Sequence, residues 1–599
     1  MISHGRLFCS LLFAFFLVAR SKAATPTAAQ WAALNQTVNG RLFAGVPLAQ
    51  SCYSSYNGNA TTPDAAVCSA VQANYTGSNY ISDNYSGFMN TNWGTCQRTG
   101  EGCPLDWNTP SDPTVYAPGQ TCYQGSVSPY YIEVQEVSDI QAGLQFANET
   151  GVPLSIKNTG HDYTGRSSAP GSLALWTHNV QPEMTLTKGF IPDGCSEPVG
   201  DGVTLGAGQQ FAGLYQFADE NNVTVVGGAA GSVGPAGGWI TGGGHSAITN
   251  VFGLGVDNVM QIRTVLPNGT YVTANECQNQ DLWFALRGGG GSTFGVNFEM
   301  TTRANPKIVL QVAYINYYSP DTNSSAELIS LMIQSATQWA AQGWGGYLSP
   351  GAYSKQYHSL ILVTPLLTNA EAIAAMTPLF DLANAPGNYV YSSGVNTVNS
   401  YYEMYNVYLA PGGEKLGLGT ALGSRLIPAS QFDGPAKQYE LLEALLEVQD
   451  MITYPTRSND TLLLSYGVPF QILVTTPSSY PTTAANDTSA VHPAWREAVW
   501  HMVMNVPFSN SASAGDVQTA FEIATNATDV LRELIPDGGA YLNEADTFEK
   551  DRVGAFWGQA KYERLVGIKK ELDPGNLLTC FGCIGWDETD ERFGCYPDI

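Results

Sequence analysis

Residues 227–259 read GGAAGSVGPAGGWITGGGHSAITNVFGLGVDNV, and this stretch decides the fold. Its glycines let the backbone bend so that several N–H groups point the same way, and such a surface holds a pyrophosphate without a lysine. One glycine-rich turn alone is usually only a turn. Two more stretches of small residues lie nearby in the chain, SIKNTGHDYTGRSSAPG at 155–171 and the glycine run 288–291. Together the three stretches indicate a nucleotide-binding region.

The spacing of these glycines excludes the common nucleotide motifs. No G-x-x-x-x-G-K-[ST] occurs, so the chain has no P-loop. Gly206 and Gly208 lack the third glycine of the dinucleotide fingerprint, and no lysine follows the run 288–291. No G-x-S-x-G supports a serine hydrolase. His245 follows three glycines but has no second histidine at helical spacing, so we expect no metal site.

The stretch at 155–171 carries a histidine that needs an explanation. His161 is one of only seven histidines in 599 residues, and it lies in a loop directly after an apolar run. Asp162 and Arg166 flank it among Gly, Ser and Thr. The ordinary interpretation is a loop histidine satisfied by hydrogen bonds. The alternative is that the small neighbours make room for a ligand at its ring.

The first residues have the pattern of a secretory signal peptide. His4 and Arg6 precede an apolar run at 7–19, and Ser21 and Ala23 supply the small residues before a cut after Ala23. A membrane anchor is the alternative, but about 13 apolar residues are too few to span a bilayer. We therefore expect a secreted, extracellular protein that does not bind a membrane.

Cysteine usage agrees with export. Ten cysteines remain after the signal peptide, an even number that predicts disulfides whose pairing the sequence does not give. Cys580 and Cys583 form a C-x-x-C, but no histidine or second pair lies near enough to make a zinc site, so a disulfide is favoured. N-x-[ST] sequons, beginning at Asn35, Asn59 and Asn74, predict N-glycans.

The net charge is −25, which would repel nucleic acid and an anionic membrane surface. At 599 residues the chain exceeds one ordinary core, and two domains are expected.

Hydrophobic periodicity gives a coarse secondary structure. Residues 129–135 and 152–158 predict strands around a helix at 137–151, with Ser138 as its cap and Ile140, Leu144 and Ala147 on one face. Later segments repeat this alternation. They are a strand–helix–strand at 202–228, a hairpin around Asn268–Gly269, a helix and strand at 281–304, a strand at 307–318, a helix at 325–343 and one long amphipathic helix at 552–572.

In combination, five stretches resemble the berberine bridge enzyme-like oxidoreductases of the vanillyl-alcohol oxidase superfamily, especially their secreted fungal branch. They are IKNTGHDYTGRSS, GGWITGGGHSAITNVFGLGVDNV, NECQNQDLWFALRGGGGSTFGVNFEM, GGAYLNEAD, and FWGQAKYERLVGIKKELDPGNLLTC with CIGWDE. The resemblance runs from about residue 120 to 590 and implies a flavoprotein with bound FAD.

The family resemblance implies an α+β fold in two domains. N- and C-terminal parts would form the FAD-binding domain, and a central substrate domain would carry an antiparallel sheet with flanking helices. The expected units are a signal peptide (1–23), a disulfide-rich cap (24–125), a PCMH-type FAD-binding domain (126–305), a substrate domain (306–545) and a C-terminal segment that returns to the FAD domain (546–599).

By resemblance, His161 is the residue joined covalently to the flavin, through its Nδ1 to the 8α-methyl. Lys157, Arg166 or backbone donors would hold the flavin's negative charge. Many members carry a second link from a cysteine that falls here on Ala230. Alanine has no sulfur, so we expect a single covalent bond and a less oxidising flavin.

The remaining FAD contacts are transferred residue by residue from the family. They divide into the His161 loop, the pyrophosphate glycines, the adenosine side, an adenine contact and a residue near the isoalloxazine. The expected contacts are Asn158, Thr159, Gly160, His161 and Asp162; Gly231, Ser232, Val233, Gly234, Gly237, Gly238, Thr241, Gly242, Gly243, Gly244 and His245; Gly253, Leu254, Val256 and Asp257; Val296; and Asn543.

The resemblance implies hydride transfer from a substrate C–H to flavin N5, with O2 the common acceptor and H2O2 the product. A base takes the adjacent proton, and Tyr541, Glu544 and Gln471 are the candidates. His492 and Arg496 are expected to be structural. The absent second link favours a small metabolite alcohol over an oligosaccharide. A flavin-free binding glycoprotein is the alternative from another class.

Overall fold

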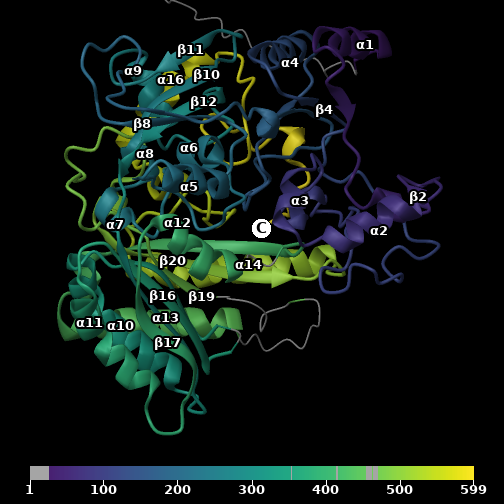
Figure 1. Cartoon of the computed structure of the whole chain (residues 1–599). Helices are drawn as coiled ribbons and strands as arrows, with labels where there is room; N and C mark the ends of the chain where they lie inside the picture. Colours follow the sequence, from purple (N-terminus) through teal and green to yellow (C-terminus); the bar gives the residue numbers. More distant parts are fainter. Residues whose placement is uncertain (1–25, 353, 413–415, 454–461, 463–469) are drawn as a thin grey trace, which may run out of the picture.

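The computed structural model describes residues 26–352, 354–412, 416–453, 462 and 470–599. The expected signal peptide therefore lies outside the described residues. No described helix is both long and apolar enough to cross a bilayer. Three regions are visible in Figure 1: an N-terminal cap in purple, an upper region of blue and teal elements with yellow C-terminal segments, and a green lower region.

The N-terminal cap is made of short elements tied by disulfides. Its elements are α1 (Ala28–Thr37), β2 (Ser55–Tyr56), β3 (Asn59–Ala60), α2 (Ala65–Asn74) and α3 (Ser78–Ser82). Two disulfides lie inside it, Cys52–Cys68 and Cys103–Cys122. A third disulfide joins the cap to the end of the chain, Cys96–Cys595. All ten cysteines among the described residues are paired, as their even number predicts; Cys195 bonds Cys277, and Cys580 bonds Cys583.

Two sheets form the upper region. The first has the order β1-β4-β6-β5 and is parallel except for its edge strand β1. The second is antiparallel, with the order β11-β10-β12-β8-β7. Their strands are β1 (Leu42–Ala44), β4 (Tyr130–Glu133), β5 (Leu154–Lys157), β6 (Leu173–Trp176), β7 (Thr185–Thr187), β8 (Gly202–Gly206), β10 (Val259–Val265), β11 (Tyr271–Ala274) and β12 (Val296–Arg303).

Helices α4 (Val137–Thr150), α5 (Phe211–Glu220), α9 (Gln280–Leu286) and α16 (Gln559–Leu572) pack against these sheets. In α4 the expected apolar face is confirmed, because Ile140, Leu144 and Ala147 are all buried. The predicted cap is wrong. The helix begins at Val137, and the Ser138 hydroxyl donates to Glu136 instead of accepting a backbone N–H.

The lower region is one seven-stranded antiparallel sheet with the order β17-β14-β16-β15-β19-β20-β18. Its strands are β14 (Leu310–Tyr318), β15 (Gly345–Pro350), β16 (Tyr357–Thr364), β17 (Tyr389–Val398), β18 (Gly419–Pro428), β19 (Phe470–Val474) and β20 (Ala498–Phe508). Helices α10 (Ser324–Ala341), α11 (Asn369–Ala383), α13 (Gly434–Thr453) and α14 (Ala514–Leu534) flank it (Figure 1). The expected α+β fold is confirmed.

The tail differs from its predicted single helix. It forms α15 (Arg552–Phe556) and α16, which are separated at Trp557 and Gly558. Gly558 has φ +73, a left-handed conformation that glycine adopts without strain. The break lets the chain turn so that α16 packs on α9, where Leu565 and Ile568 are buried.

Candidate functional site

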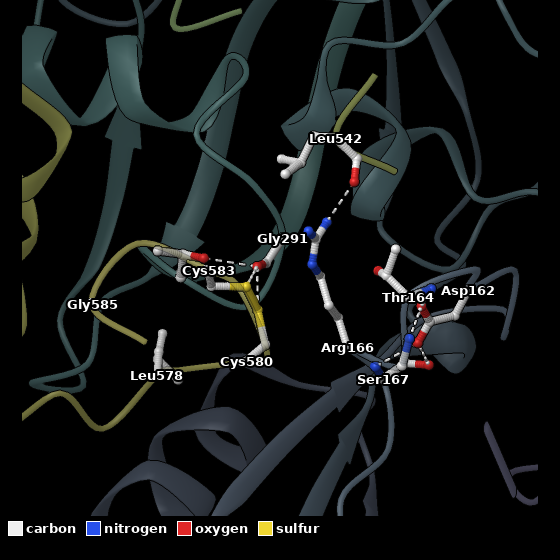
Figure 2. The surroundings of a disulfide bond; sticks show 12 residues. Asp162, Thr164, Arg166, Ser167, Gly291, Leu542, Leu578, Cys580, Cys583 and Gly585 are labelled. Carbon is white, nitrogen blue, oxygen red and sulfur yellow. Dashed lines mark hydrogen bonds between the residues drawn. A yellow bond between two sulfur atoms is a disulfide. The ribbon is translucent and has the colours of Figure 1, made fainter. Parts of the chain in front are cut away.

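Asp162 shapes the loop that presents His161. Its carboxylate accepts hydrogen bonds from the backbone N–H groups of Thr164, Gly165 and Ser167 and from the Ser167 hydroxyl (Figure 2). A carboxylate in a ring of N–H donors holds a tight turn without a helix or strand. Asp162 therefore acts within the loop, and its side chain has little capacity left for a ligand.

The glycine-rich stretch 227–259 contacts the His161 ring. Its Nε2 lies 2.7 Å from the Ser232 hydroxyl, so the loop and that stretch are in direct contact. Burial, together with the nearby charge of Lys157, lowers the pKa of His161 to about 3. The imidazole is therefore neutral at any ordinary pH, which is the form that acts as a nucleophile or ligand.

Lys157 lies beneath this loop in an aromatic cage. Its side chain is 0% exposed, and its Nζ donates to the carbonyl of Asn84 at 3.2 Å. The rings of Tyr85, Phe88 and Trp176 surround the ammonium, with centroids 5.3 to 5.7 Å away. Burial lowers the pKa of Lys157 to about 7, so only part of the ammonium stays protonated at neutral pH. A nearby anion would favour the charged form.

Most of the predicted pyrophosphate glycines pack closely against side chains of other segments, since a Cβ at Gly234 or Gly242 would collide with Asn158 or Asn543. Gly255 and Val256 donate to the carbonyls of Gly244 and Gly243, which ties this stretch to the following turn. Around Gly238 the surface is open, because a Cβ placed there would meet nothing within 4 Å. This is a cradle of the kind that a phosphate group fills.

Buried polar atoms beside this cradle lack partners. Asn158 Oδ1, Asn297 Oδ1 and Arg166 Nε are all buried, and none has a hydrogen-bond partner among the described residues. Asn158 and Arg166 belong to the His161 loop, and Arg166 also donates to the Leu542 carbonyl at 3.1 Å (Figure 2). These donors and acceptors, with the open glycine backbone, fit a dinucleotide with a pyrophosphate and polar rings.

The glycine run 288–291 and the C-terminal segment close the cradle. Gly290 donates to the carbonyl of Thr241, and Gly291 approaches Gly238. Behind Gly291 lies the Cys580–Cys583 disulfide, whose sulfurs are 3.5 and 3.9 Å from the Gly291 carbonyl oxygen (Figure 2). The disulfide thus supports this loop from below, and no zinc site is formed there.

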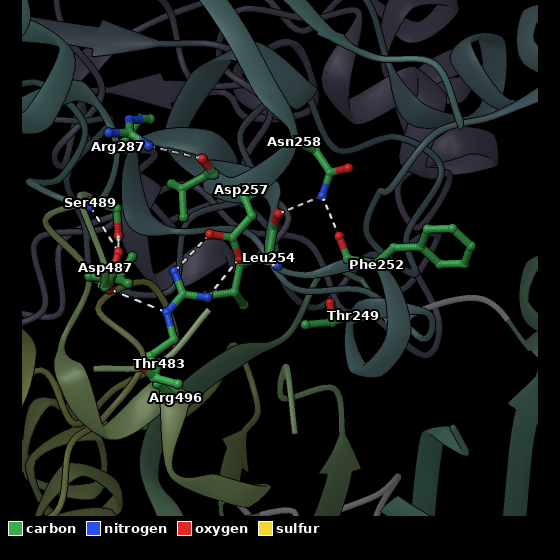
Figure 3. Close-up of polar contacts among 12 residues, drawn as sticks. Thr249, Phe252, Leu254, Asp257, Asn258, Arg287, Thr483, Asp487, Ser489 and Arg496 are labelled. Atoms are coloured by element: carbon green, nitrogen blue, oxygen red, sulfur yellow. Dashed lines mark hydrogen bonds and ion pairs between the residues drawn. The ribbon is translucent and has the colours of Figure 1, made fainter. Parts of the chain in front are cut away.

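Asp257 has a structural role in this fold. Its carboxylate pairs with the Arg496 guanidinium at 2.7 and 2.8 Å and also accepts from the Leu254 N–H (Figure 3). Arg496 contacts Asp487 as well. The expectation that Arg496 braces the structure fits this arrangement. Both carboxylate oxygens of Asp257 therefore already have partners within the protein. The expected contact of Asp257 with the cofactor stays a prediction.

One face of the seven-stranded sheet looks towards the His161 loop. Gln471 is opposite Val503, and Leu473 is opposite His501, so these four side chains share that face. Tyr163 of the His161 loop packs against Leu473 and Val503 there. The alternate residues of the same strands point the other way into the helical layer.

The C-terminal segment places three predicted site residues, Tyr541, Asn543 and Glu544, where the sheet face meets the glycine cradle. Tyr541 is buried, and its hydroxyl accepts from Asn543 Nδ2 at 2.9 Å. Asn543 Nδ2 also donates to the Gly238 carbonyl at 2.8 Å, which places it on the cradle, and its contact with the isoalloxazine stays a prediction. Glu544 Oε1 lies 3.3 Å from His245 Nε2.

The charge states of these groups differ. Burial acts to raise the pKa of Glu544, but His245 outweighs it, and the pKa is lowered. Burial and the Glu544 charge raise the pKa of Tyr541. At neutral pH the carboxylate is therefore ionised and the phenol is not.

The structure thus unites the three glycine-containing stretches, the Tyr541–Glu544 segment and the sheet face that carries Gln471. Val296 lies at the start of β12, buried and paired with Val265. Sequence reasoning missed His501, which lies beside His245 and Glu544. Its only signal was a histidine within an otherwise apolar run, AVWHMVMNVPF.

Comparison with known proteins agrees with this site. The family model described as FAD binding domain matches residues 128–275, and the model described as berberine and berberine like matches residues 540–580. FAD-linked oxidoreductase ffsJ of Aspergillus flavipes is 36% identical over 578 residues, which are 93% of this chain and 92% of ffsJ.

Solved structures share the fold. The VAO-type flavoprotein MtVAO615 from Myceliophthora thermophila C1 superposes with a TM-score of 0.76 at 25% identity, covering 95% of this chain and 97% of that one. Glucooligosaccharide oxidase from Acremonium strictum, described with a 6-S-cysteinyl, 8α-N1-histidyl FAD, has a TM-score of 0.60 at 19% identity, covering 76% and 91%.

Fold and site together define a flavoprotein of the vanillyl-alcohol oxidase type. The chain belongs to the FAD-linked oxidoreductases with a berberine-like C-terminal segment. Its cofactor is FAD, and the open glycine backbone and the unpartnered polar atoms described above fit that group.

Proposed function

We propose that the protein is a secreted oxidase that carries FAD on a single covalent bond to His161 and oxidises an alcohol, or a related C–H, of a small metabolite. The observation that carries this proposal is the half-buried, neutral imidazole of His161, held by Ser232 next to the glycine cradle. FAD, when bound, accepts a hydride from the substrate carbon, and we propose O2 as the electron acceptor, giving H2O2.

A single bond is supported by the residue at the position of the second link. Ala230 has only a methyl side chain, and no cysteine thiol is free nearby because all ten described cysteines are in disulfides. His161 uses Nε2 towards Ser232, and Nδ1 is the nitrogen proposed for the flavin. Ser232 therefore orients the ring for attachment through Nδ1.

Glu544 is the proton acceptor that the charges favour. It is ionised, its side chain is 22% exposed, and it lies on the segment that carries Asn543. Tyr541 is a weaker candidate, because its raised pKa opposes formation of a phenolate. Gln471 cannot take a proton at neutral pH, and its place on the sheet face suits a hydrogen bond to the substrate.

Export is supported by the disulfides, which persist in oxidising compartments. The sequon asparagines Asn59 and Asn74 are exposed, as glycosylation requires, and Asn35 is half-buried.

Replacing His161 with Ala tests the attachment. We expect wild-type protein to give a flavin-fluorescent band after denaturing electrophoresis and His161→Ala to give none. His178→Ala, which removes a buried histidine of the same region, should keep the band. A fluorescent His161→Ala band would refute this anchor, and a cross-linked pair of flavin peptides in mass spectrometry would refute the single bond.

The substrate is tested by a peroxide assay over aromatic and aliphatic alcohols, mono- and oligosaccharides. We expect turnover with a small alcohol. Turnover confined to oligosaccharides would favour the carbohydrate oxidase alternative. Protein without yellow colour would favour a flavin-free binding glycoprotein.

A further inference from the structure

Three metal-ligating side chains converge where the sheet face meets the glycine cradle. His245, His501 and Glu544 each offer one ligand atom, and these atoms lie within 4.8 Å of one another. They come from three separate parts of the chain: the glycine-rich stretch, strand β20 and the C-terminal segment. No local spacing in the sequence reveals them, because the fold alone brings them together.

His501 is the member of this cluster that hydrogen bonding leaves unexplained. Its side chain is 0% exposed, and neither ring nitrogen has a hydrogen-bond partner among the described residues. His245 Nδ1 is likewise buried without one. A buried polar group without a partner is destabilising, so a ring with two such atoms calls for an occupant.

We propose that His245, His501 and Glu544 form a binding site for a divalent cation of the zinc class. Two histidines and one glutamate are a recurrent three-residue ligand set for such ions, with the fourth position open to water or substrate. The site rests on these three side chains and does not depend on the proposed flavin reaction.

The distances suit one ion. Two ligands of a tetrahedral zinc with bonds of about 2.1 Å lie about 3.4 Å apart. Glu544 Oε1 is 3.3 Å from His245 Nε2, and Glu544 Oε2 is 3.8 Å from His501 Nδ1. Small rotations of the side chains bring the three ligands onto a common centre.

The charge around Glu544 also suits a cation. No lysine or arginine forms an ion pair with Glu544 among the described residues, so its negative charge is available to a cation.

The surroundings limit the access of water to the ion. The Trp495 ring lies 5.5 Å from His501 and 6.2 Å from His245, and the Tyr541 ring lies 5.8 and 5.0 Å from them. A bound ion would engage the Glu544 carboxylate, so in the metal-loaded protein Glu544 would act as a ligand and not as the proton acceptor.

The test measures metal in the flavin-loaded protein. Wild-type protein is stripped with a chelator, reloaded with ZnCl2 and dialysed. We expect it to retain about one zinc per chain, measured by inductively coupled plasma mass spectrometry. His501→Gln and Glu544→Gln should bind zinc more than about 100-fold more weakly. His358→Gln is the matched control, since His358 is a buried histidine of the same sheet whose two nitrogens already have partners, and it should bind zinc like wild type.

Two further measurements keep the result decisive if a variant folds poorly. His501→Cys, which keeps a ligand, should retain zinc, and ZnCl2 should raise the Tm of wild type and His358→Gln but not of His501→Gln. Zinc at the same low level in wild type and His501→Gln, with no shift in Tm, would overturn the proposal. The cluster would then be a proton-holding group only, and the His161 experiment would still decide the flavin attachment.

Discussion

Lys157 shows how one buried charge makes stability depend on pH. The pKa of Lys157 is about 7 in the folded protein and 10.5 for an ordinary, solvated lysine, as in the unfolded chain. The unfolded chain therefore binds the proton more tightly. Between pH 10.5 and 7 the native state therefore loses stability as pH falls, by about 1.4 kcal/mol per pH unit, and below pH 7 the loss is complete and constant.

We expect the Tm of wild type, relative to that of Lys157→Met, to rise from pH 7 to pH 10 and to stay flat below pH 7. Met fills a similar volume without a charge, so the difference isolates the titration. Thermal unfolding at a series of pH values measures it. Parallel Tm curves across this range would show that Lys157 keeps its ordinary pKa.

At this scale the sequence predicts some residues and not others. His161, Asn543 and the glycines are recognisable because their neighbours in the chain form a motif. His501 has no such neighbours. Its position depends on the register that sets Leu473 opposite His501, and strand pairing between distant segments is not written in local pattern.

The tail helices show that a local sequence pattern does not always predict where a helix ends. The amphipathic pattern at 552–572 is continuous, yet the chain breaks at Gly558 because packing of α16 against α9 outweighs local helix propensity. Two glycines in this segment then have opposite roles. Gly558 has φ +73, whereas Gly567 lies within α16 with open space around its Cα.

We expect Gly558→Ala to lower the free energy of unfolding by about 1 kcal/mol, because alanine is strained in the left-handed region. Gly567→Ala should raise it by up to about 1 kcal/mol, because alanine favours the helix. Tm values of the two variants measure the effect. Shifts of the same sign would mean that the break at Gly558 does not exist in solution.

For the whole molecule, the family resemblance predicted the α+β architecture, and the even cysteine number predicted full pairing. The partners of each cysteine were not predictable, because they follow from tertiary contact. Cys96–Cys595 spans 499 residues, whereas Cys52–Cys68 spans 16. Among the described disulfides, the long bridge is the one that joins the cap to the end of the chain, where Arg98 also pairs with Asp598.

We expect the double variant Cys96→Ser, Cys595→Ser to lose more stability than Cys52→Ser, Cys68→Ser. Chain entropy gives about 6 kcal/mol for a very long closed loop and about 3 kcal/mol for a short one. Calorimetry on both variants compares the losses. An equal or larger loss for the short bridge would show that the cap gains its order from local contacts.

The yellow C-terminal segment beside the early strands in Figure 1 has a consequence for biosynthesis. Asn543 contacts Gly238, and Arg166 contacts the carbonyl of Leu542, so the cradle is complete only when residues past 540 have arrived. On the ribosome, the nascent chain would already carry His161, the proposed attachment site, while lacking one side of the cradle. Cofactor loading must then wait for release of the finished polypeptide, and a prematurely stopped chain would emerge colourless.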